Sequence, residues 1–378
     1  MTPPALDSPP RPYKVLHVGK YYPPHMGGIE THLQTLCSLL KQFVPLDVLV
    51  FADDRRTMTD TVEGVEVTRL GKSLDLAGAP VSWELIKRLR QTDAAIVHLH
   101  LPNPFATLAY LASGHKGHLF ISYHGEIVRQ RVLSLFYAPV LDATLSRAHS
   151  ILVATSDHIV HSPTLLRHQK RCRVVPYGIP ARHFLTRLPE QADIIRKNGS
   201  LPLILSVGRL VYYKGFDVLI RAMGAVNARL IIIGDGPLRG ELEALSESLG
   251  LSDRVTILGG VPDVRPYYQA CAFFVLPSVA RSEAFGIVQL EAMASGKSVI
   301  NTRLPSGVPS VSIHDETGLT VPPSDPEALS RAMNRLLSDP VLRGRFERSA
   351  VERVGERFTG EKMAWRTLEL YDQAISES

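Results

Sequence analysis

Short runs rich in Val, Ile and Leu alternate with helix-length amphipathic stretches along most of this chain, and no other feature constrains its fold as strongly. Continuous apolar strands separated by helices indicate a parallel sheet covered on both faces, because each connection between parallel strands must cross over the sheet. The pattern occurs twice, so it predicts an α/β protein with two doubly wound domains that face each other across a cleft. The expected strands are 13–18, 46–52, 65–70, 94–99, 119–123, 151–154, 173–175, 203–207, 229–233, 255–258, 273–276 and 298–301. The expected helices are 29–42, 82–90, 105–112, 130–147, 157–166, 216–226, 238–249, 264–270, 287–294 and 326–337.

A polar stretch between the two repeats, residues 184–200, is the expected hinge, since it contains Pro189, Asn198 and Gly199. A length of 378 residues also fits two domains better than one. In doubly wound folds, ligands bind beyond the carboxyl ends of the strands. The loops that follow the expected strands are therefore the places where function is expected.

The two halves of the chain differ in charge. Residues 1–190 hold 21 Lys and Arg against 15 Asp and Glu, whereas residues 191–378 hold 21 against 22, and thirteen of the 14 histidines lie in the first half. This asymmetry suggests that the first domain faces an anionic partner. A phosphorylated substrate and a membrane surface are the favoured candidates. Nucleic acid is disfavoured, because no Lys/Arg run with interleaved aromatic residues occurs.

Cysteine usage and apolar runs narrow the class of protein further. The three cysteines are scattered without CxxC spacing, which excludes a disulfide framework and a zinc knuckle and suits a reducing compartment. Residues 1–11 contain four prolines and no apolar core of a signal peptide, and the apolar run 132–141 is about half the length of a membrane span. We therefore expect a soluble, cytoplasmic protein.

Two loops carry groups suited to an anion. Gly27 and Gly28 follow the first expected strand and open a helix, where backbone N–H groups and the helix dipole favour negative charge. Arg209 and Lys214 follow the first strand of the second half, and their cations could converge on one diphosphate. A merely flexible turn at the glycines and a pair of solvated cations remain the alternatives.

Two glycine motifs come close to nucleotide-binding fingerprints, and each fails at one position. The Gly-Asp-Gly-Pro motif at 234–237 lacks the third glycine of a dinucleotide fingerprint, because that position is Arg239. The Gly-Lys-Ser motif at 296–298 ends like a P-loop, but the earlier glycine falls on Glu291. The sequence thus fits neither an NAD dehydrogenase nor a P-loop NTPase, and 234–237 is expected to form a tight turn.

The most informative stretch is 281–293, in which Glu283 and Glu291 stand eight residues apart. If Glu283 precedes the helix, both carboxylates can line one side of a ligand, and N–H groups at the helix start are left without partners. Carboxylates accept hydrogen bonds from hydroxyls, so sugar and ribose groups are natural ligands. An amphipathic helix with solvated acids is the poorer account.

The Glu283…Glu291 spacing, followed by an Ala-Met-Ala-Ser-Gly turn, resembles the E-x7-E signature of retaining GT-B glycosyltransferases, and within them group 1 and glycosyltransferase family four. The Ser-Gly-Val-Pro motif at 306–309 resembles a subgroup that makes bacterial surface polysaccharides. The chain as a whole resembles bacterial mannosyltransferases of surface-polysaccharide or glycolipid synthesis. The turn at 296–298 departs from many relatives, which have proline there. Further matching motifs lie at 27–28, 97–100, 123–125, 175–179, 208–209, 214–215, 234–236 and 316–319.

The resemblance implies a role for each charged residue. Arg209 and Lys214 would bind the donor diphosphate, Glu291 would hold the ribose, and Glu283 would hold the hydroxyls of the transferred sugar. His124 matches a family histidine that touches the donor sugar, and a histidine satisfied in a core turn is its alternative.

Backbone groups complete the implied donor site. The N–H groups of Phe285, Gly286 and Ile287 would serve the sugar and the phosphate. Val261 would meet the nucleobase through its backbone. Gly28, in the Gly27-Gly28 loop, would bring the first domain against the diphosphate when the cleft closes.

The resemblance also implies how the domains divide the work. Residues 1–183 would form the acceptor-side domain and 201–360 the nucleotide-sugar-binding domain. The last stretch, 361–378, would be a helix that crosses back to the first domain. No DxD-type motif is apparent in the sequence, so we expect metal-independent transfer without a cofactor, and front-face displacement in which the departing phosphate assists deprotonation of the acceptor.

The expected function is transfer of a hexose, with mannose from GDP-mannose as the first choice, to a glycan or lipid-linked acceptor. UDP-glucose or a UDP-hexosamine as donor, and a non-catalytic sugar-nucleotide sensor, remain alternatives. A lipid-linked acceptor would place the enzyme at the inner face of the cell membrane, in peripheral contact with anionic lipid. The residues that suggest this contact are Arg129, Arg131, Arg147, the apolar run 132–141, Arg167, Lys170, Arg171 and Arg173. A core helix with solvated ends is the alternative interpretation of the same residues.

Overall fold

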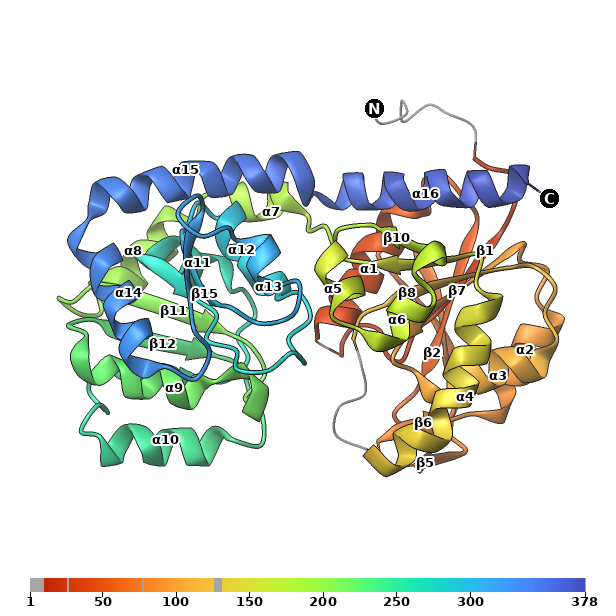
Figure 1. Cartoon of the computed structure of the whole chain (residues 1–378), viewed down its shortest axis with the longest axis horizontal. Coiled ribbons are helices and arrows are strands. Elements are labelled where there is room, and N and C mark those ends of the chain that lie inside the picture. The colour runs from red at the N-terminus through yellow and green to blue at the C-terminus, as the bar shows by residue number, and fades with distance from the viewer. Residues whose placement is uncertain (1–9, 26, 77, 126–130, 378) are drawn as a thin grey trace. The chain divides into compact units, whose positions relative to one another are not determined.

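The computed structural model describes residues 10–25, 27–76, 78–125 and 131–377, with the backbone alone for 131–136. Spatial contacts divide the chain into two compact units. The first unit joins Met1–Gly178 to Gly360–Ser378, and the second is Ile179–Thr359. Each unit is built on its own, mainly parallel, β-sheet (Figure 1).

The sheet of the first unit has the strand order β10-β9-β8-β7-β1-β2-β4-β3, and every pair in it is parallel except the antiparallel edge pair β3 and β4. A separate two-stranded hairpin pairs β5 with β6. The strands are β1 (Val15–Val18), β2 (Leu46–Phe51), β3 (Met58–Val62), β4 (Val65–Leu70), β5 (Leu74–Leu76), β6 (Ala79–Val81), β7 (Ile96–Leu101), β8 (His118–Tyr123), β9 (Ser150–Val153) and β10 (Cys172–Val174).

Helices cover both faces of this sheet, because its central strands are buried on both sides. Helices α2, α3, α4 and α6 pack their apolar residues on one face, and α1 and α16 pack on the other. The helices of the unit are α1 (Gly28–Leu40), α2 (Trp83–Gln91), α3 (Pro104–Ser113), α4 (Arg131–Arg147), α5 (Ser156–Val160), α6 (Pro163–Arg167) and α16 (Gly360–Ser376).

The second unit has a six-stranded, wholly parallel sheet in the order β13-β12-β11-β14-β15-β16. Its strands are β11 (Leu203–Val207), β12 (Arg229–Ile233), β13 (Val255–Leu258), β14 (Phe273–Val275), β15 (Val299–Thr302) and β16 (Gly318–Val321). Its α-helices are α7 (Ala181–Leu185), α8 (Pro189–Lys197), α9 (Phe216–Ala222), α10 (Arg239–Ser248), α11 (Arg265–Ala270), α12 (Ile287–Ala294), α13 (Val308–Val311), α14 (Pro326–Ser338) and α15 (Pro340–Arg357).

In each sheet the strand order reverses direction at one place. In the first unit, β1 has β2 on one side and β7 on the other, and in the second unit β11 lies between β12 and β14. At such a point the connections leave toward opposite faces and open a crevice beyond the strand ends. The two doubly wound α/β units predicted from the strand–helix alternation are thereby confirmed.

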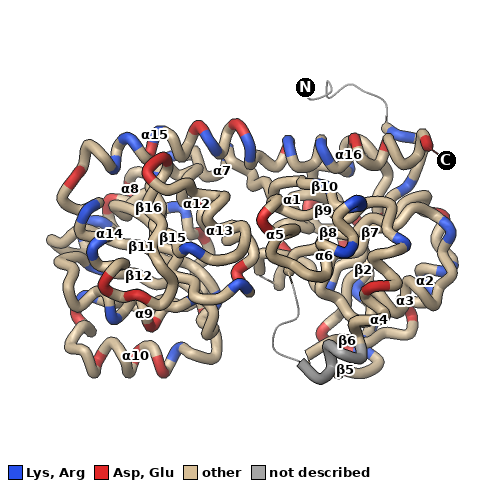
Figure 2. The backbone as a smooth tube through the Cα atoms, in the orientation of Figure 1, with Lys and Arg blue, Asp and Glu red and all other residues tan. Residues whose placement is uncertain are grey.

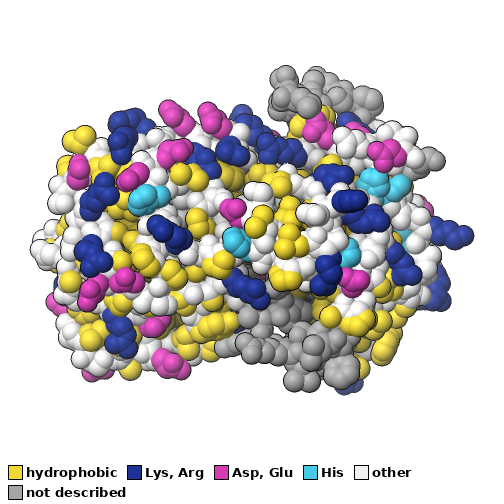
Figure 3. All heavy atoms as spheres, in the orientation of Figure 1, with side chains coloured by type: hydrophobic (Ala, Val, Ile, Leu, Met, Phe, Trp, Pro, Cys, Tyr) yellow, Lys and Arg dark blue, Asp and Glu magenta, His cyan; other side chains and the backbone are white. Residues whose placement is uncertain are grey.

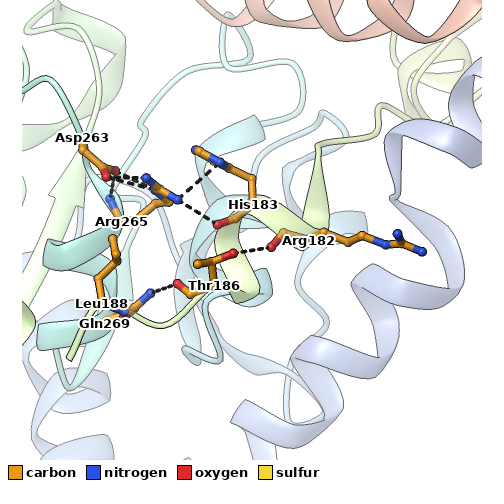
Figure 4. A network of polar contacts seen from close by, with 7 residues as sticks. All are labelled: Arg182, His183, Thr186, Leu188, Asp263, Arg265 and Gln269. Atoms are coloured by element: carbon orange, nitrogen blue, oxygen red, sulfur yellow. Dashed lines mark hydrogen bonds and ion pairs between the residues drawn. The ribbon is translucent and has the colours of Figure 1, made fainter.

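Residues 184–200, expected to be a hinge, belong to the second unit instead. Pro189 starts α8, and polar groups of α11 satisfy the backbone between α7 and α8 (Figure 4). The side chain of Gln269 accepts a hydrogen bond from the N–H of Leu188 (2.7 Å) and donates one to the carbonyl of Thr186 (2.7 Å). Hydrogen bonds within the second unit thus hold the backbone of this stretch, so its polarity was a misleading sign of a linker.

Other elements also differ from expectation. The expected helix 157–166 is two short helices, because Ser162 caps α6 and Pro163 begins it. The strands β3 and β16 and the 18-residue helix α15 were not expected. β3 and α15 are largely polar, so their sequences carry little apolar periodicity.

Candidate functional site

The expected diphosphate cation and the expected sugar carboxylate meet beyond the end of β11. Lys214 Nζ lies 2.5 Å from Glu283 Oε2, and both side chains are about nine-tenths buried. The same carboxylate oxygen accepts a hydrogen bond from the Ser278 hydroxyl at 3.1 Å. Residues 69 positions apart in sequence thus form one buried ion pair at the point where the strand order of the second unit reverses.

Backbone geometry brings the two loops together. Gly215 has a φ of +65°, and a Cβ atom on it would lie 2.2 Å from the carbonyl oxygen of Pro277. The N–H of Val279 donates to the carbonyl of Tyr213 at 2.8 Å. Only glycine permits this close approach, so the Lys214-Gly215 pair in the sequence sets the position of the ion pair.

Burial would disfavour a charged lysine, yet Lys214 keeps its charge. Desolvation lowers the pKa of the ammonium, but the Glu283 carboxylate together with Tyr213 and Glu291 more than offsets this effect, and the net pKa is raised. The Glu291 carboxylate contributes in the same direction. A fixed cation in a largely dry site is well suited to stabilise negative charge on a ligand.

Glu291 lies one turn inside α12 and is half-buried. Its Oε2 accepts a hydrogen bond from the Tyr268 hydroxyl at 2.8 Å. Burial raises the pKa of the Glu291 carboxyl, while the Tyr268 hydrogen bond and the Lys214 charge oppose that rise. Both acids of the eight-residue spacing therefore lie within the electrostatic reach of one lysine.

The start of α12 presents backbone donors next to Glu283. Gly286 precedes the helix with a φ of +74°, which turns the chain from the loop into the first helical residue, Ile287. Phe285 is buried and holds the loop against the core. The first N–H groups of any helix lack acceptors within the helix, so this end can receive anionic or hydroxyl oxygens.

Arg209 and Val261 lie in loops that follow β11 and β13, the two strands on either side of β12 in the second unit. Arg209 is exposed after β11. Burial raises the pKa of the nearby Tyr213 hydroxyl, and the charge of Arg209 opposes that rise. Val261 is half-buried after β13. The loop that carries Val261 is anchored by Asp263, which bonds the Arg265 backbone at 2.9 Å and pairs with its guanidinium at 2.7 Å (Figure 4).

The remaining predicted residues lie in the first unit. Gly27 and Gly28 begin α1, and Gly27 caps this helix without a side-chain hydrogen bond. A Cβ atom on Gly27 would lie 2.4 Å from a carboxylate oxygen of Glu30. His124 follows β8 and is buried, 6% exposed.

His124 is part of a buried cluster of five imidazoles, which includes His17 on β1, His32 on α1, and His98 and His100 on β7. Ring centroids within the cluster lie as close as 4.6 Å for the pair on β7 and 4.8 Å for His32 and His124. Burial lowers the pKa of all five rings, to about 3 for His17 and for His32. We name this group the histidine cluster.

A chain of hydrogen bonds links three members of the histidine cluster. His17 Nδ1 lies 3.1 Å from His100 Nε2, and His100 Nδ1 lies 3.2 Å from His124 Nε2. His124 Nδ1 lies 2.5 Å from the Tyr177 hydroxyl. Both ring nitrogens of His124 therefore have partners inside the first unit.

Sequence reasoning took the histidine-rich half as a sign of an anionic partner and missed the histidine cluster. The sequence of β7 could have revealed the cluster, because side chains two positions apart in a strand lie on the same face of the sheet. Ile96 packs against α1 and α16, so His98 and His100 face the same helices. His17 is the register partner of His98 on β1.

Two family models match the chain. The model described as Glycosyltransferase Family 4 matches residues 26–183, and the model described as Glycosyl transferases group 1 matches residues 189–353.

Similar proteins span nearly the same length. The O-antigen chain mannosyltransferase C of Escherichia coli is 30% identical over 367 residues, which are 95% of this chain and 98% of that protein. The D-rhamnosyltransferase WbpZ of Pseudomonas aeruginosa is 33% identical over 352 residues, 92% of each chain. The solved sucrose-phosphate synthase from Thermosynechococcus elongatus has a TM-score of 0.80 at 23% identity, over 97% of this chain and 100% of that one. Anabaena HepE in complex with UDP-glucose has a TM-score of 0.80 at 18% identity, over 96% and 100%.

Proposed function

Because this chain belongs to the glycosyltransferases of group 1 and family 4, with the GT-B fold, we propose that it is a retaining hexosyltransferase that moves mannose from GDP-mannose to a glycan or lipid-linked acceptor. The observation that carries the proposal is the buried Lys214–Glu283 pair with Glu291 beside it, at the strand-order reversal of the second unit. It combines a cation for phosphate with carboxylates for hydroxyls in one place.

The choice of mannose rests on the names of two relatives. One is named a mannosyltransferase and the other a D-rhamnosyltransferase, and D-rhamnose is 6-deoxymannose. Both names therefore refer to sugars of the manno configuration. The same comparison supports a role in the synthesis of a bacterial surface polysaccharide.

In the proposed reaction, cleavage of the anomeric bond places negative charge on the departing nucleoside diphosphate. Lys214, Arg209 and the N–H groups of Phe285, Gly286 and Ile287 stabilise that charge, and Gly28 approaches it from the first unit. The departing phosphate takes the proton of the acceptor hydroxyl while the new bond forms on the same face, so the anomeric configuration is retained. No metal ion takes part at the diphosphate in this proposal.

Carboxylates orient the donor before the bond breaks. Glu283 accepts hydrogen bonds from hydroxyls of the transferred sugar, and its pairing with Lys214 fixes its position. Glu291 accepts a hydrogen bond from the ribose, and Val261 contacts the nucleobase through its backbone. A hydrogen bond from His124 to the donor sugar requires exchange of one of its two present partners, Tyr177 or His100.

A donor panel tests the proposal. Thermal unfolding of the protein is measured with GDP-mannose, UDP-glucose, UDP-hexosamines and ADP-glucose, because a ligand of the folded state raises the melting temperature. Release of nucleoside diphosphate in the presence of acceptor is then measured with each donor. We expect the largest shift and the only rapid release with GDP-mannose. A larger melting-temperature shift and faster release with a UDP-sugar would show that the donor is that UDP-sugar and not GDP-mannose. Donor binding without any release of nucleoside diphosphate would show that the protein is a non-catalytic sensor.

The second part of the proposal is that the first unit binds an anionic acceptor or an anionic membrane surface. Exposed cations on this unit are suited to such a contact. Figure 2 shows Lys and Arg stretches around α6, and Figure 3 shows their side chains interspersed with apolar ones on the viewed face of this unit. Leu166 and Val174 are 44% and 45% exposed beside these cations. Three of the cations also bind nearby carbonyls or a carboxylate, namely Arg167, Arg171 and Arg173, whereas the ammonium group of Lys170 has no partner among the described residues.

Of the other residues expected at this surface, Arg129 lies outside the described residues and Arg131 is described by its backbone alone. Arg147, at the end of α4, is exposed. Among the described residues, no helix is long and apolar enough to cross a membrane.

Liposome flotation tests the membrane contact. We expect binding to vesicles that contain anionic lipid, weakened by salt, and about fivefold weaker for each cation replaced, since a surface cation contributes about 1 kcal/mol. Lys170→Ser and Arg173→Ser are the test variants, and Arg331→Ser on the second unit is the control. Equal binding to neutral vesicles, or a loss with the control, would contradict the contact.

A further inference from the structure

The histidine cluster contains more imidazoles than the proposed transfer uses. The proposal assigns a role to His124 alone, whereas His32 is 3% exposed and neither of its ring nitrogens has a hydrogen-bond partner. Among the described residues His32 therefore has no hydrogen-bond partner, and an imidazole buried in this way loses the free energy of hydration of both nitrogens. We propose that His32, His100 and His124 form a binding site for one divalent transition-metal ion of the Zn²⁺ class.

The distances suit such an ion. One nitrogen from each of the three rings lies within 4.8 Å of the other two. His100 Nδ1 and His124 Nε2 are 3.2 Å apart. Zinc–nitrogen bonds of about 2.0–2.1 Å in a tetrahedron give nitrogen separations of about 3.4 Å. One edge of the site therefore already has the required length, and the ring of His32 must move by little more than 1 Å.

The outer hydrogen bonds fix the correct nitrogens for coordination. A coordinating histidine presents a lone pair to the metal and donates its other N–H to a fixed acceptor. Here His100 would donate from Nε2 to His17 Nδ1, and His124 would donate from Nδ1 to the Tyr177 oxygen. Both rings then turn lone pairs toward each other and toward His32, and the ion replaces the single hydrogen bond that now joins them.

A second histidine trio, His17, His98 and His100, fits less well. Both ring nitrogens of His98 are occupied, one by the Tyr371 hydroxyl and the other by the Ser122 hydroxyl at 2.9 Å. Coordination by His98 would leave one of these buried hydroxyls without a partner. The trio that contains the unpartnered His32 has no such cost.

The donor set also indicates the class of metal. Both trios consist of imidazoles alone. Neutral imidazole suits Zn²⁺, Cu²⁺, Ni²⁺ and Co²⁺, whereas Ca²⁺ and Mg²⁺ prefer oxygen ligands. Three histidines with a fourth position left for water is a known zinc arrangement. The site lies wholly in the first unit, whereas the proposed diphosphate ligands Lys214 and Arg209 lie in the second.

Metal binding has a consequence for transfer that rests on the proposed function. The ion would hold His124 by Nε2 and keep this ring away from a donor sugar. Bound Zn²⁺ should therefore inhibit transfer, and removal by a chelator should restore it. Metal uptake itself is measured without donor or acceptor, so failure of the proposed function leaves the metal site testable.

The experiment uses the full chain after treatment with a chelator. Co²⁺ is titrated while the visible absorption bands of tetrahedral cobalt are recorded, and Zn²⁺ is then added to displace it. We expect one Co²⁺ per chain, displacement by one Zn²⁺, and a rise in melting temperature with either ion. Ca²⁺ and Mg²⁺ should give no rise.

The informative variant is His32→Leu, which removes two unpartnered nitrogens and keeps an apolar side chain in the core. We expect it to fold as well as the parent in the absence of metal and to lose Co²⁺ affinity by at least about 100-fold. His115→Leu, a histidine of the first unit outside both trios, is the matched control and should bind like the parent. His17→Leu removes only the acceptor of the His100 N–H and should weaken binding about 10–100-fold.

Three results would overturn the proposal. The first is a folded parent that takes up no Co²⁺ or Zn²⁺. The second is equal uptake by His32→Leu, and the third is an equal loss with His115→Leu. A His32→Leu variant that is more stable than the parent, in a parent that binds no metal, would assign His32 to the core alone.

Discussion

The two units place opposite chemistry at equivalent positions of their sheets. At the strand-order reversal of the second unit, Lys214 and Glu283 form a buried pair of full charges. At the reversal of the first unit, between β1 and β7, the histidine cluster holds imidazoles whose pKa burial lowers. The first site keeps its charges because each charge has a counter-charge. The imidazoles of the other site are neutral because burial without a counter-charge lowers their pKa.

The difference shows that the doubly wound architecture supplies a location and leaves the chemistry to the side chains. A charged site of this kind is ready for a phosphate and its sugar. A neutral site lined by imidazole nitrogens lacks the positive charge that would hold an anion, and its donors are of the kind that suit the transition-metal ion proposed above.

Removal of one charge should damage the second unit most. Glu283→Ala leaves the Lys214 ammonium buried without its partner, which costs about 3–5 kcal/mol of unfolding free energy. It also removes the proposed sugar contact, so transfer should fall by at least about 100-fold. Denaturant unfolding and release of nucleoside diphosphate measure the two effects.

Two further variants control this prediction. Glu327→Gln removes a glutamate that pairs with Arg331 at the surface and should change neither quantity appreciably. Glu283→Gln keeps the shape of the side chain and should recover part of the stability but little activity. Full transfer activity in a folded Glu283→Ala protein would contradict the site.

The second-largest loss of stability is expected when the loop at Gly215 is forced away from the loop at Pro277. Gly215→Ala forces a Cβ atom toward the Pro277 carbonyl at a positive φ, so we expect a loss of about 3 kcal/mol and weaker donor binding. Gly224→Ala is the matched control, because nothing lies within 4 Å of a Cβ atom there. Thermal unfolding with and without donor compares the two variants, and an equal effect of both would contradict the loop geometry.

The neutral site should respond to loss of a hydrogen bond and not of a charge. Tyr371→Phe leaves one buried nitrogen of His98 without its partner, which costs about 1–3 kcal/mol. We expect the unfolding of the first unit to shift while donor binding by the second unit stays unchanged. A shift in donor affinity as large as the shift in stability would show that the two sites are not independent.

The smallest effect concerns the ionisation of Glu291. Its carboxylate is ionised above its pKa, so donor affinity that depends on it should be present at higher pH and lost as pH falls. The Tyr268 hydroxyl acts against the rise of this pKa. Tyr268→Phe should therefore raise the pKa further and move the acidic loss of donor affinity to higher pH.

A pH series of donor binding by calorimetry measures this shift. At neutral pH the variant should bind about three- to tenfold more weakly, the equivalent of one hydrogen bond. Tyr267→Phe, on the same helix, is the control, and it should leave the pH profile in place. An acidic loss that moves to lower pH would contradict the role assigned to Tyr268.

The sequence predicted those features that follow from strands and loops. Lys214 and Glu283 were recognised because each lies in a loop beyond a strongly apolar strand, where parallel sheets gather their ligands. The family resemblance drawn from the Glu283…Glu291 spacing is confirmed by the family models and the relatives. The roles of the individual residues stay predictions.

Features that depend on long-range packing could not be predicted in this way. His32 joins the histidine cluster because α1 crosses the face of β1 and β7, which nothing in the local sequence of the helix reveals. The stretch 184–200 seemed a linker because its partners lie on α11, about 80 residues later. Polar β3 finds its place only through pairing with β4.

Because α16 belongs to the first unit, the two units cannot be completed in the order in which they begin during co-translational folding. Met363, Leu368 and Tyr371 fill the same apolar layer as Val15 and Phe120, although the whole second unit is encoded between them. A nascent chain on the ribosome can complete its second unit while the first still exposes one side of its sheet. The helix α16 closes that side and is translated only after the second unit, so a premature stop before Gly360 would yield a chain whose first unit is open to chaperones and proteases.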